Sequence, residues 1–200
     1  MGYARAGFDV TGVDIAKQPR YPFRFIQGDA LEYVAAHGHE YDAIVASPPC
    51  QGYSVTKSLY RADHRYLIPA TRAALQATGA PYVIENVEGA RPEMIAPVML
   101  CGASFGLKVY RHRLFECSFF MLAPTHLRHR ERVLNRRWVA DWGGFVTVTG
   151  GFNCSKAVAS KAMGIDWMTK AELAQSIPPA FTEFIGRQLR QRIEQRLGVA

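Results

Sequence analysis

Three short polar motifs in this chain of 200 residues carry side chains that could perform catalysis. They are Pro49-Cys50-Gln51, Glu85-Asn86-Val87 and Arg111-His112-Arg113. A cysteine is nucleophilic only as its thiolate, which nearby positive charge favours. A glutamate at the end of an apolar strand is partly desolvated, which raises its pKa and lets it act as an acid. Two arginines at alternate strand positions point the same way, toward a phosphate or a carbonyl.

Each motif also has an explanation without catalysis. A single buried cysteine usually packs as a small apolar side chain. A Glu-Asn pair after a strand is common turn chemistry. The three motifs are more specific together, because they follow one another along the chain and each lies beside a predicted strand.

The elements that position these motifs form an alternating pattern in the first half of the chain. Residues 8–15, 41–46 and 81–87 are typical of strands, and helical patterns at 29–38 and 64–77 separate them. This alternation predicts an α/β fold with a doubly wound, mostly parallel, Rossmann-like sheet. Ligands bind at the carboxyl edge of such a sheet.

Prolines place the cysteine at that edge. Pro48 and Pro49 follow the apolar run Ile44-Val45-Ala46 and cannot donate ladder hydrogen bonds, so the strand must stop there. Cys50 is therefore expected in a stiffened loop after the strand.

The second half of the chain has a different organisation. A strand with alternating charge is expected at 109–117, and 118–165 shows little periodicity apart from one glycine-bracketed strand at 143–151. From 166 the pattern is helical and includes a capping box between Thr169 and Glu172. We therefore divide the chain into an α/β core (1–117), a small irregular insertion (118–165) and C-terminal helices (166–200).

In this order the motifs resemble those of the C5-cytosine DNA methyltransferases. "SPPCQGYS" is similar to the family's nucleophile loop, "VIENVEG" to its Glu-Asn-Val motif and "YRHRLFE" to its Arg-x-Arg strand. "AGFDVTGVDI" and "GDALEY" resemble its cofactor motifs, and "QSIPPAFTEFIGRQL" resembles its C-terminal helix motif, without the usual Gly-Asn-Ser. The resemblance covers most of the chain apart from 118–165, which stands where the family has its target-recognition region.

The resemblance implies methyl transfer to C5 of a cytosine that is flipped out of double-stranded DNA. Cys50 would attack C6 of the base, and Glu85 would hydrogen-bond or protonate N3, so that charge does not build up on the ring. Arg113 would hold the cytosine O2, and Arg111 would support the loop or a phosphate. Such an enzyme could protect DNA from a restriction nuclease.

The same resemblance implies S-adenosylmethionine as the methyl donor. Asp14 would bind the ribose hydroxyls, as the acidic residue does in dinucleotide folds. Asp29 would accept from the adenine amine, Pro49 would line the cofactor cleft, and Ile15 and Ala30 complete the expected cofactor site.

Basic residues favour a nucleic-acid partner. The formal net charge is +7, which permits a polyanionic partner without proving one. The alternative is a basic surface that reads no sequence. The residues expected to contact DNA are Gln51, Ser54, Arg128, Arg130, Arg136 and Arg137.

The chain departs from the family at its N-terminus. It begins at Met1-Gly2-Tyr3, within the helix that follows the family's first strand and glycine-rich loop. Met1 could be an internal methionine of a longer reading frame, or a partner chain could supply the first strand and the glycine-rich loop. The protein could also be a catalytically impaired DNA-binding relative. The same chemistry on tRNA is a further alternative.

The remaining cysteines and histidines receive a structural interpretation. Cys101, Cys117 and Cys154 are expected to pack, and Cys117, His126 and His129 match no strong metal-site spacing, so no metal is predicted. No CxxC pair, secretory signal or apolar run of membrane-spanning length is present. These features predict a reduced cytoplasmic protein without a membrane partner, expected to be a monomer.

Overall fold

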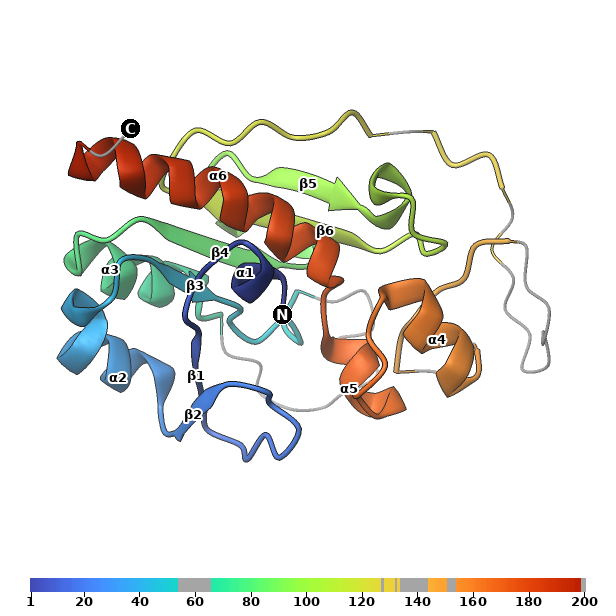
Figure 1. Cartoon of the computed structure of the whole chain (residues 1–200), viewed down its shortest axis with the longest axis horizontal. Coiled ribbons are helices and arrows are strands. Elements are labelled where there is room, and N and C mark those ends of the chain that lie inside the picture. Colours follow the sequence, from blue (N-terminus) through green and yellow to red (C-terminus); the bar gives the residue numbers. More distant parts are fainter. Residues whose placement is uncertain (54–65, 127, 132, 134–143, 151–153, 199–200) are drawn as a thin grey trace. The chain divides into compact units, whose positions relative to one another are not determined.

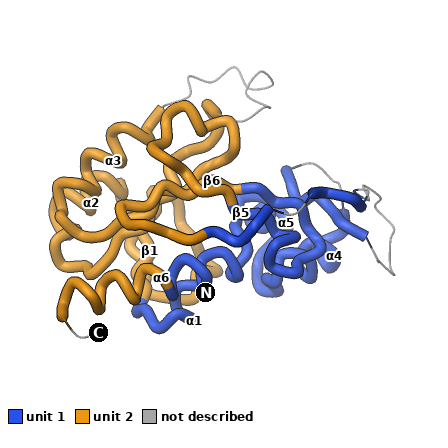
Figure 2. Tube along the Cα trace, turned by 90° about the horizontal axis from the view of Figure 1, so that it is seen from above, with its two compact units in different colours: residues 1–9, 100–112, 123–187 blue, residues 10–99, 113–122, 188–200 orange. Residues whose placement is uncertain are grey.

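The structure, a computed structural model, describes residues 1–53, 66–126, 128–131, 133, 144–150 and 154–198. The chain divides into two compact units, shown in blue and orange in Figure 2. Unit 1 comprises residues 1–9, 100–112 and 123–187, and unit 2 comprises residues 10–99, 113–122 and 188–200. Both units are built from segments that are far apart in the sequence, so neither follows the expected order of core, insertion and C-terminal helices, and that division stays a prediction.

Unit 2 contains the strands that alternate with helices (Figure 1). The strands are β1 (Thr11–Asp14), β2 (Arg24–Gln27), β3 (Ile44–Ala46), β4 (Tyr82–Asn86), β5 (Val98–Cys101) and β6 (His112–Cys117), of which β5 ends and β6 begins in unit 1. β1 pairs with β2 and β3 pairs with β4, both in parallel, whereas β6 runs antiparallel to β4. The expected α/β class is confirmed, and the larger sheet, of order β3-β4-β6-β5, is mixed.

The helices of unit 2 lie between these strands in the chain. They are α2 (Ala30–His37), the 3₁₀ helices η1 (Gly38–Glu40) and η3 (Glu88–Glu93), and α3 (Ile68–Ala77). Helices α2 and α3 pack against each other (Figure 1). Ile68 and Leu75 of α3 pack with Ile84 of β4 and Leu114 of β6 in one apolar cluster. Burial of this cluster stabilises the strands whose ends carry the polar motifs.

The strands of unit 2 fall into two sheets, which correspond to parts of a doubly wound order. In a sheet of order 3-2-1-4-5, strand 1 separates strand 2 from strand 4. Here β2-β1 corresponds to 3-2, and β3-β4 corresponds to 4-5. Among the described residues no strand takes the place of strand 1.

Unit 1 contains one short helix at the N-terminus and most of the helices in the second half of the chain. They are α1 (Gly2–Arg5), the 3₁₀ helix η4 (Gly102–Phe105), α4 (Lys156–Met163), α5 (Lys170–Gln175) and the first part of α6 (Pro179–Leu197). The start of α6 packs on the N-terminal segment so tightly that a Cβ on Gly2 would overlap the Thr182 hydroxyl and the Pro179 carbonyl oxygen. The capping box is confirmed, because Thr169 and Glu172 each accept from the other's backbone N–H.

Several sequence predictions need correction. Residues 143–151 form no strand in their described part, where Phe145 and Val146 make only isolated bridges. The sequence did not predict β2, β5 or α4. The buried face of α4 is formed by Ala159, Ala162 and Met163, and small residues give a weak apolar signal. At the C-terminal end of α6, the large apolar side chain of Leu197 is 66% exposed.

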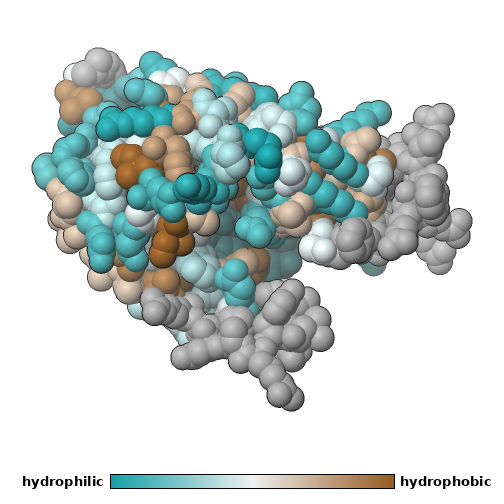
Figure 3. All heavy atoms as spheres, turned by 90° about the horizontal axis from the view of Figure 1, so that it is seen from below, coloured by the Kyte–Doolittle hydropathy of each residue, from teal (hydrophilic) through white to brown (hydrophobic). Residues whose placement is uncertain are grey.

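Among the described residues, large apolar side chains such as Ile15, Phe120 and Leu122 are exposed. On the face drawn in Figure 3, hydrophobic residues form small groups among hydrophilic ones. In the described part of the chain, no helix combines the length and the apolar character needed to cross a membrane.

Candidate active site

The Cys50 loop begins where β3 ends, as the two prolines predict. Cys50 is half-buried and Pro49 is exposed. The Tyr53 N–H donates to the Cys50 carbonyl oxygen at 3.0 Å, which closes a turn around the cysteine. The thiol therefore lies in a constrained turn at the carboxyl end of a parallel strand, where ligands bind in such sheets.

Asn86 holds this loop against the end of β4. Its Nδ2 donates to the Pro48 carbonyl oxygen at 3.0 Å, and its Oδ1 accepts from the Val87 N–H at 2.9 Å. The parallel register pairs Ala46 with Ile84, so the residues two places further on also lie side by side. Asn86 is 1% exposed. This role of Asn86 in holding the Cys50 loop was not predicted from the sequence. The signal for it was that Asn86 lies at the same strand end as Glu85.

Gly89 gives the loop a second close contact. A Cβ at this position would overlap the Tyr53 carbonyl oxygen. A larger residue at position 89 must therefore displace the turn that carries Cys50.

Glu85 and Arg113 form an ion pair on the sheet. The Arg113 Nε lies 2.9 Å from the Glu85 Oε1, and the two side chains are 16% and 11% exposed. The antiparallel register pairs Glu85 with Phe115, so Arg113, two residues earlier in β6, is the diagonal neighbour on the same face. The structure thus joins two of the predicted catalytic residues directly. Asn86, the residue next to Glu85, holds the Cys50 loop at the same strand end.

Arg111 has a different environment, within unit 1. It is 5% exposed, and its guanidinium donates to the carbonyl oxygens of Val148 and Ala174. These bonds join the end of α5 to residue 148 of the expected insertion. They hold the backbone at residues 148 and 174, and the role predicted for Arg111, support of the loop or of a phosphate, stays a prediction.

Four of the five predicted cofactor residues, all except Pro49, lie at the ends of β1 and β2. Asp14 ends β1, and Asp29 follows β2 by two residues, where it caps α2 through the Leu31 and Glu32 N–H groups. The Asp14 carboxylate accepts from the Ala16 N–H at 2.8 Å and from the Gln18 Nε2 at 3.1 Å. Parallel pairing of β1 with β2 brings both carboxylates to one sheet edge.

Apolar and small residues accompany these carboxylates. Ile15, directly after β1, is 73% exposed, and Ala30 at the start of α2 is also exposed. An exposed isoleucine beside two carboxylates offers both an apolar contact and hydrogen-bond acceptors to an adenosine-like group.

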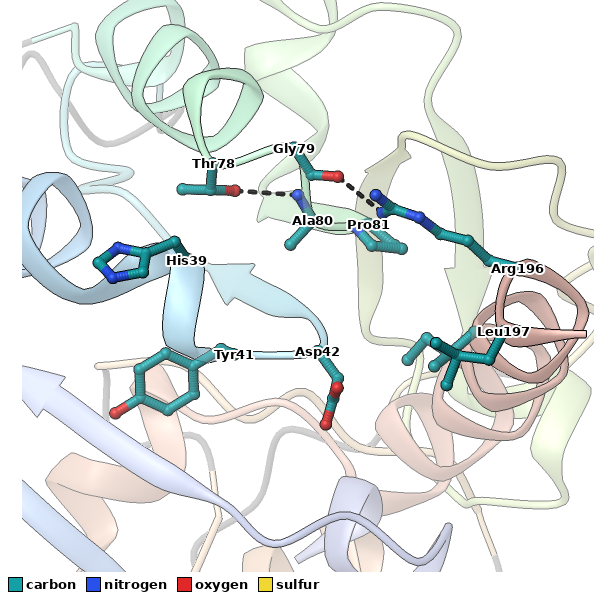
Figure 4. Close-up of a pocket in the computed structure, with 10 residues that line it drawn as sticks. His39, Tyr41, Asp42, Thr78, Gly79, Ala80, Pro81, Arg196 and Leu197 are labelled. Atoms are coloured by element: carbon teal, nitrogen blue, oxygen red, sulfur yellow. Dashed lines mark hydrogen bonds between the residues drawn. The ribbon is translucent and has the colours of Figure 1, made fainter. Parts of the chain in front are cut away.

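A pocket of about 240 Å³ lies elsewhere in unit 2 (Figure 4). It opens between the segments that precede β3 and β4 and the end of α6, where the Arg196 Nη1 donates to the Gly79 carbonyl oxygen at 2.7 Å. This is the amino edge of the strands, opposite to the end that carries Cys50 and Glu85. Position in the sheet therefore favours the carboxyl edge as the candidate site, because ligands of open α/β sheets bind there.

The predicted DNA contacts are only partly described. Gln51, Arg128 and Arg130 are exposed. Ser54, Arg136 and Arg137 lie outside the described residues, as does most of 134–153. The DNA contacts as a set stay a prediction.

The histidines near the insertion have a different cysteine partner from the one considered in the sequence. His126 and His129 lie with Cys101 and His112, all in unit 1. Cys117, in unit 2, instead contacts the Met121 sulfur at 3.8 Å. The grouping with Cys117 was considered from the sequence and declined. In the fold, Cys101 at the end of β5 and His112 at the start of β6 meet this loop instead.

The cysteines differ in their capacity to ionise. Burial, helped by the negative charge of Glu116, raises the pKa of the Cys117 thiol to about 12. Burial also raises the pKa of the Cys154 thiol. At about pH 8 roughly one Cys117 thiol in 10⁴ is ionised, so this side chain is a poor nucleophile.

We expect an alkylating reagent to modify Cys50 first. With iodoacetamide at about pH 8, peptide mass spectrometry should show Cys117 and Cys154 reacting at least about tenfold more slowly than the partly exposed Cys50. In urea the difference should vanish, since all the thiols are then solvated. Equal rates in the folded protein would contradict the assignment of Cys50 as the reactive cysteine.

Replacement of Asn86 should loosen the Cys50 loop. Asn86→Ala removes the bond to Pro48, a loss of about 1 kcal/mol, and should raise the rate of Cys50 alkylation about fivefold by local opening. Gln191→Ala, which removes an exposed amide on α6, is the matched control and should leave the rate unchanged. An unchanged rate in Asn86→Ala would show that Asn86 does not hold the loop.

The comparisons with known proteins bear on the fold. No profile of a known protein family matches the chain, and the search of curated proteins found no relative. Among solved structures, the chain is similar to the crystal structure of a prophage-encoded E. coli protein described as a candidate DNA modification methyltransferase. The TM-score is 0.60 at 14% identity, over 95% of this chain and 94% of the other. The two chains share a fold. This supports the expected Rossmann-like architecture and bears on no individual residue.

Proposed function

We propose that the protein is an S-adenosylmethionine-dependent DNA methyltransferase that acts on C5 of cytosine. The observation that carries this proposal is the Glu85–Arg113 ion pair beside the Cys50 loop at the carboxyl edge of the sheet. The shared fold with an E. coli protein described as a candidate DNA modification methyltransferase supports the same class of reaction.

In the proposed reaction, Cys50 acts as the nucleophile on an extruded cytosine. Its thiolate forms a bond to C6 while the C5–C6 double bond becomes a nucleophile at C5. Glu85 shares a proton with N3, so the electrons pushed into the ring are stabilised there. Arg113 donates to O2 and keeps the Glu85 side chain oriented. After C5 has gained a methyl group, a base removes the C5 proton and the C6–S bond breaks, which returns the Cys50 thiolate.

The ion pair sets a condition for substrate binding. The Glu85 carboxylate and the Arg113 guanidinium satisfy each other at 2.9 Å in the structure. A cytosine that reaches both must replace part of this contact with its N3 and O2. The ring carries an acceptor at O2 and a site for a shared proton at N3, so the exchange keeps both side chains hydrogen-bonded.

The residues at the ends of β1 and β2 fit an adenosine group. Asp14 would accept from ribose hydroxyls in place of Gln18, Asp29 would accept from the adenine amine, and Ile15 would cover one face of the ring. When bound there, S-adenosylmethionine supplies an electrophilic methyl group. Pro49 would line the path between this group and Cys50.

Methyl transfer can be measured directly. We expect the protein, incubated with DNA and S-adenosylmethionine labelled in the methyl group, to yield labelled 5-methylcytosine after digestion to nucleosides. Label in another nucleoside would overturn the C5 assignment. Label in tRNA but not in DNA would support the same chemistry on a different nucleic acid.

A second candidate function is DNA binding without methyl transfer. One observation favours it: no described strand separates β1 from β3, and in a doubly wound sheet that strand carries cofactor contacts. Calorimetric titration with S-adenosylmethionine separates the two functions. No detectable cofactor binding, with DNA binding that survives Cys50→Ser, would favour this candidate over the enzyme.

A further inference from the structure

Four metal-binding side chains meet in unit 1, away from the residues of the proposed reaction. They are Cys101 at the end of β5, His112 at the start of β6, and His126 and His129 in the loop that follows β6. One ligand atom from each lies within 4.8 Å of the ligand atoms of the other three. The cluster unites segments separated by up to 28 residues, so no local spacing in the sequence reveals it.

Ring nitrogens of the three histidines face one another. The His112 Nε2 lies 3.1 Å from the His126 Nε2 and 3.3 Å from the His129 Nε2. The Cys101 Sγ lies 3.3 Å from the His129 Nε2. In hydrogen bonds between these rings, each nitrogen donates or accepts according to the tautomer of its ring. A cation at their centre would accept a lone pair from each.

These separations match those of ligands on one zinc ion. With Zn–N of about 2.0–2.1 Å and Zn–S of about 2.3 Å, tetrahedral geometry places two nitrogens about 3.3 Å apart, and nitrogen and sulfur about 3.6 Å apart. The observed distances of 3.1–3.3 Å are close to these values. The other pairs of ligand atoms lie within 4.8 Å of each other, so the side chains would need to shift by about 1 Å or less to accept the ion.

Neighbouring residues already hold the ligand-bearing loop. Tyr110 stacks on the His129 ring, with 3.8 Å between centroids, and Phe145 stacks on Tyr110 at 4.0 Å. The Ser104 hydroxyl donates to the Thr125 carbonyl oxygen at 3.1 Å, beside His126. Contacts of this kind orient imidazole ligands and reduce the entropy lost on metal binding.

We propose that Cys101, His112, His126 and His129 form a structural zinc site. One sulfur and three imidazole nitrogens select a borderline transition metal over Mg²⁺ or Ca²⁺, which prefer oxygen. Four protein ligands leave no open position for a substrate, which is typical of a structural site. Binding releases the Cys101 thiol proton to solvent, as thiolate ligation requires.

The site would fix the loop that carries the exposed Arg128 and Arg130. His126 and His129 flank Arg128, and Arg130 follows directly. Zinc would therefore anchor this basic segment to the end of β5 and the start of β6, through ligands that all belong to unit 1. This role does not depend on the proposed reaction, since it needs neither cofactor nor DNA.

Metal content and a cobalt spectrum test the site. The untagged full chain, expressed with added zinc and dialysed, should hold one zinc ion per chain by plasma mass spectrometry. Replacement by Co²⁺ should give the visible bands of a tetrahedral ion and a sulfur-to-metal charge-transfer band. Less than about a tenth of an equivalent of zinc, together with no tetrahedral cobalt spectrum, would overturn the proposal.

Matched variants locate the ligands. His126→Ala replaces an exposed side chain, so the fold should persist while zinc affinity, measured by competition with a chromogenic chelator, falls about 100-fold or more. His39→Ala, another exposed histidine, should leave the affinity unchanged. Cys101→Ser should abolish the charge-transfer band, whereas Cys154→Ala should retain it. A band that survives Cys101→Ser, or equal losses in His126→Ala and His39→Ala, would refute the assigned ligand set.

Discussion

Cys50→Ala abolishes covalent capture of DNA that contains 5-fluorocytosine. The unaltered protein, with S-adenosylmethionine present, should form an adduct that survives denaturing electrophoresis, because fluorine at C5 prevents the final proton removal and so blocks release of the sulfur. Alanine has no atom that can bond to C6. Turnover on ordinary cytosine should fall by roughly 10³-fold or more, as expected for loss of a nucleophile.

The control for this experiment is another cysteine of the same unit. Cys117→Ala removes a thiol whose pKa of about 12 keeps it protonated, so capture should be unaffected. Peptide mapping of the adduct should place the bond at Cys50. Capture that persists in Cys50→Ala, or a bond mapped to another residue, would remove Cys50 from the mechanism.

Arg72→Met lowers the free energy of unfolding of the protein by about 3–5 kcal/mol. Arg72 donates to both oxygens of Glu116, at 2.6 and 2.8 Å, and also to the Glu93 carbonyl oxygen. Glu116 is 2% exposed and accepts a further bond from the Ile95 N–H. Removal of the arginine leaves a buried carboxylate without its cation, which costs several kcal/mol before any change in packing.

Urea denaturation followed by circular dichroism measures this loss. The double variant Arg72→Met with Glu116→Leu should recover much of it, because no uncompensated charge remains buried. Arg190→Met breaks an exposed pair with Glu194 on α6 and should cost less than about 0.5 kcal/mol. A loss below about 1 kcal/mol in Arg72→Met would show that the Glu116 charge is compensated by other groups.

The position of this ion pair links stability to the candidate site. Glu116 and Arg113 lie on the same strand, and Glu116 is paired in register with Ile84, beside Glu85. Residues that hold β6 on β4 therefore also hold Arg113 next to Glu85. To separate a loss of stability from a loss of catalysis, the Arg72 variant should be assayed without urea and well below the temperature at which it unfolds.

Sequence patterns were sufficient for the local features of this fold. β3 and β4 could be located from apolar runs that end in prolines or polar residues. The prolines after β3 end the strand because they have no N–H to donate to a neighbouring strand. The capping box at Thr169 and the cap at Asp29 were also readable, since a helix start needs side-chain acceptors within three residues. These features depend on neighbours along the chain.

Features that depend on tertiary contact could not be read in the same way. The antiparallel direction of β6 decides that Arg113 meets Glu85, and the parallel register decides that Asn86 reaches Pro48. The burial that raises the pKa of Cys117 depends on what packs around it.

The sequence by itself determined which chemical groups this protein has and which strand ends carry them, because those properties follow from residue type and local hydrogen bonding. Only the tertiary structure decided which groups act together. It brings Cys101 together with His112, His126 and His129, and it pairs Glu85 with Arg113. These contacts join residues that lie far apart along the chain.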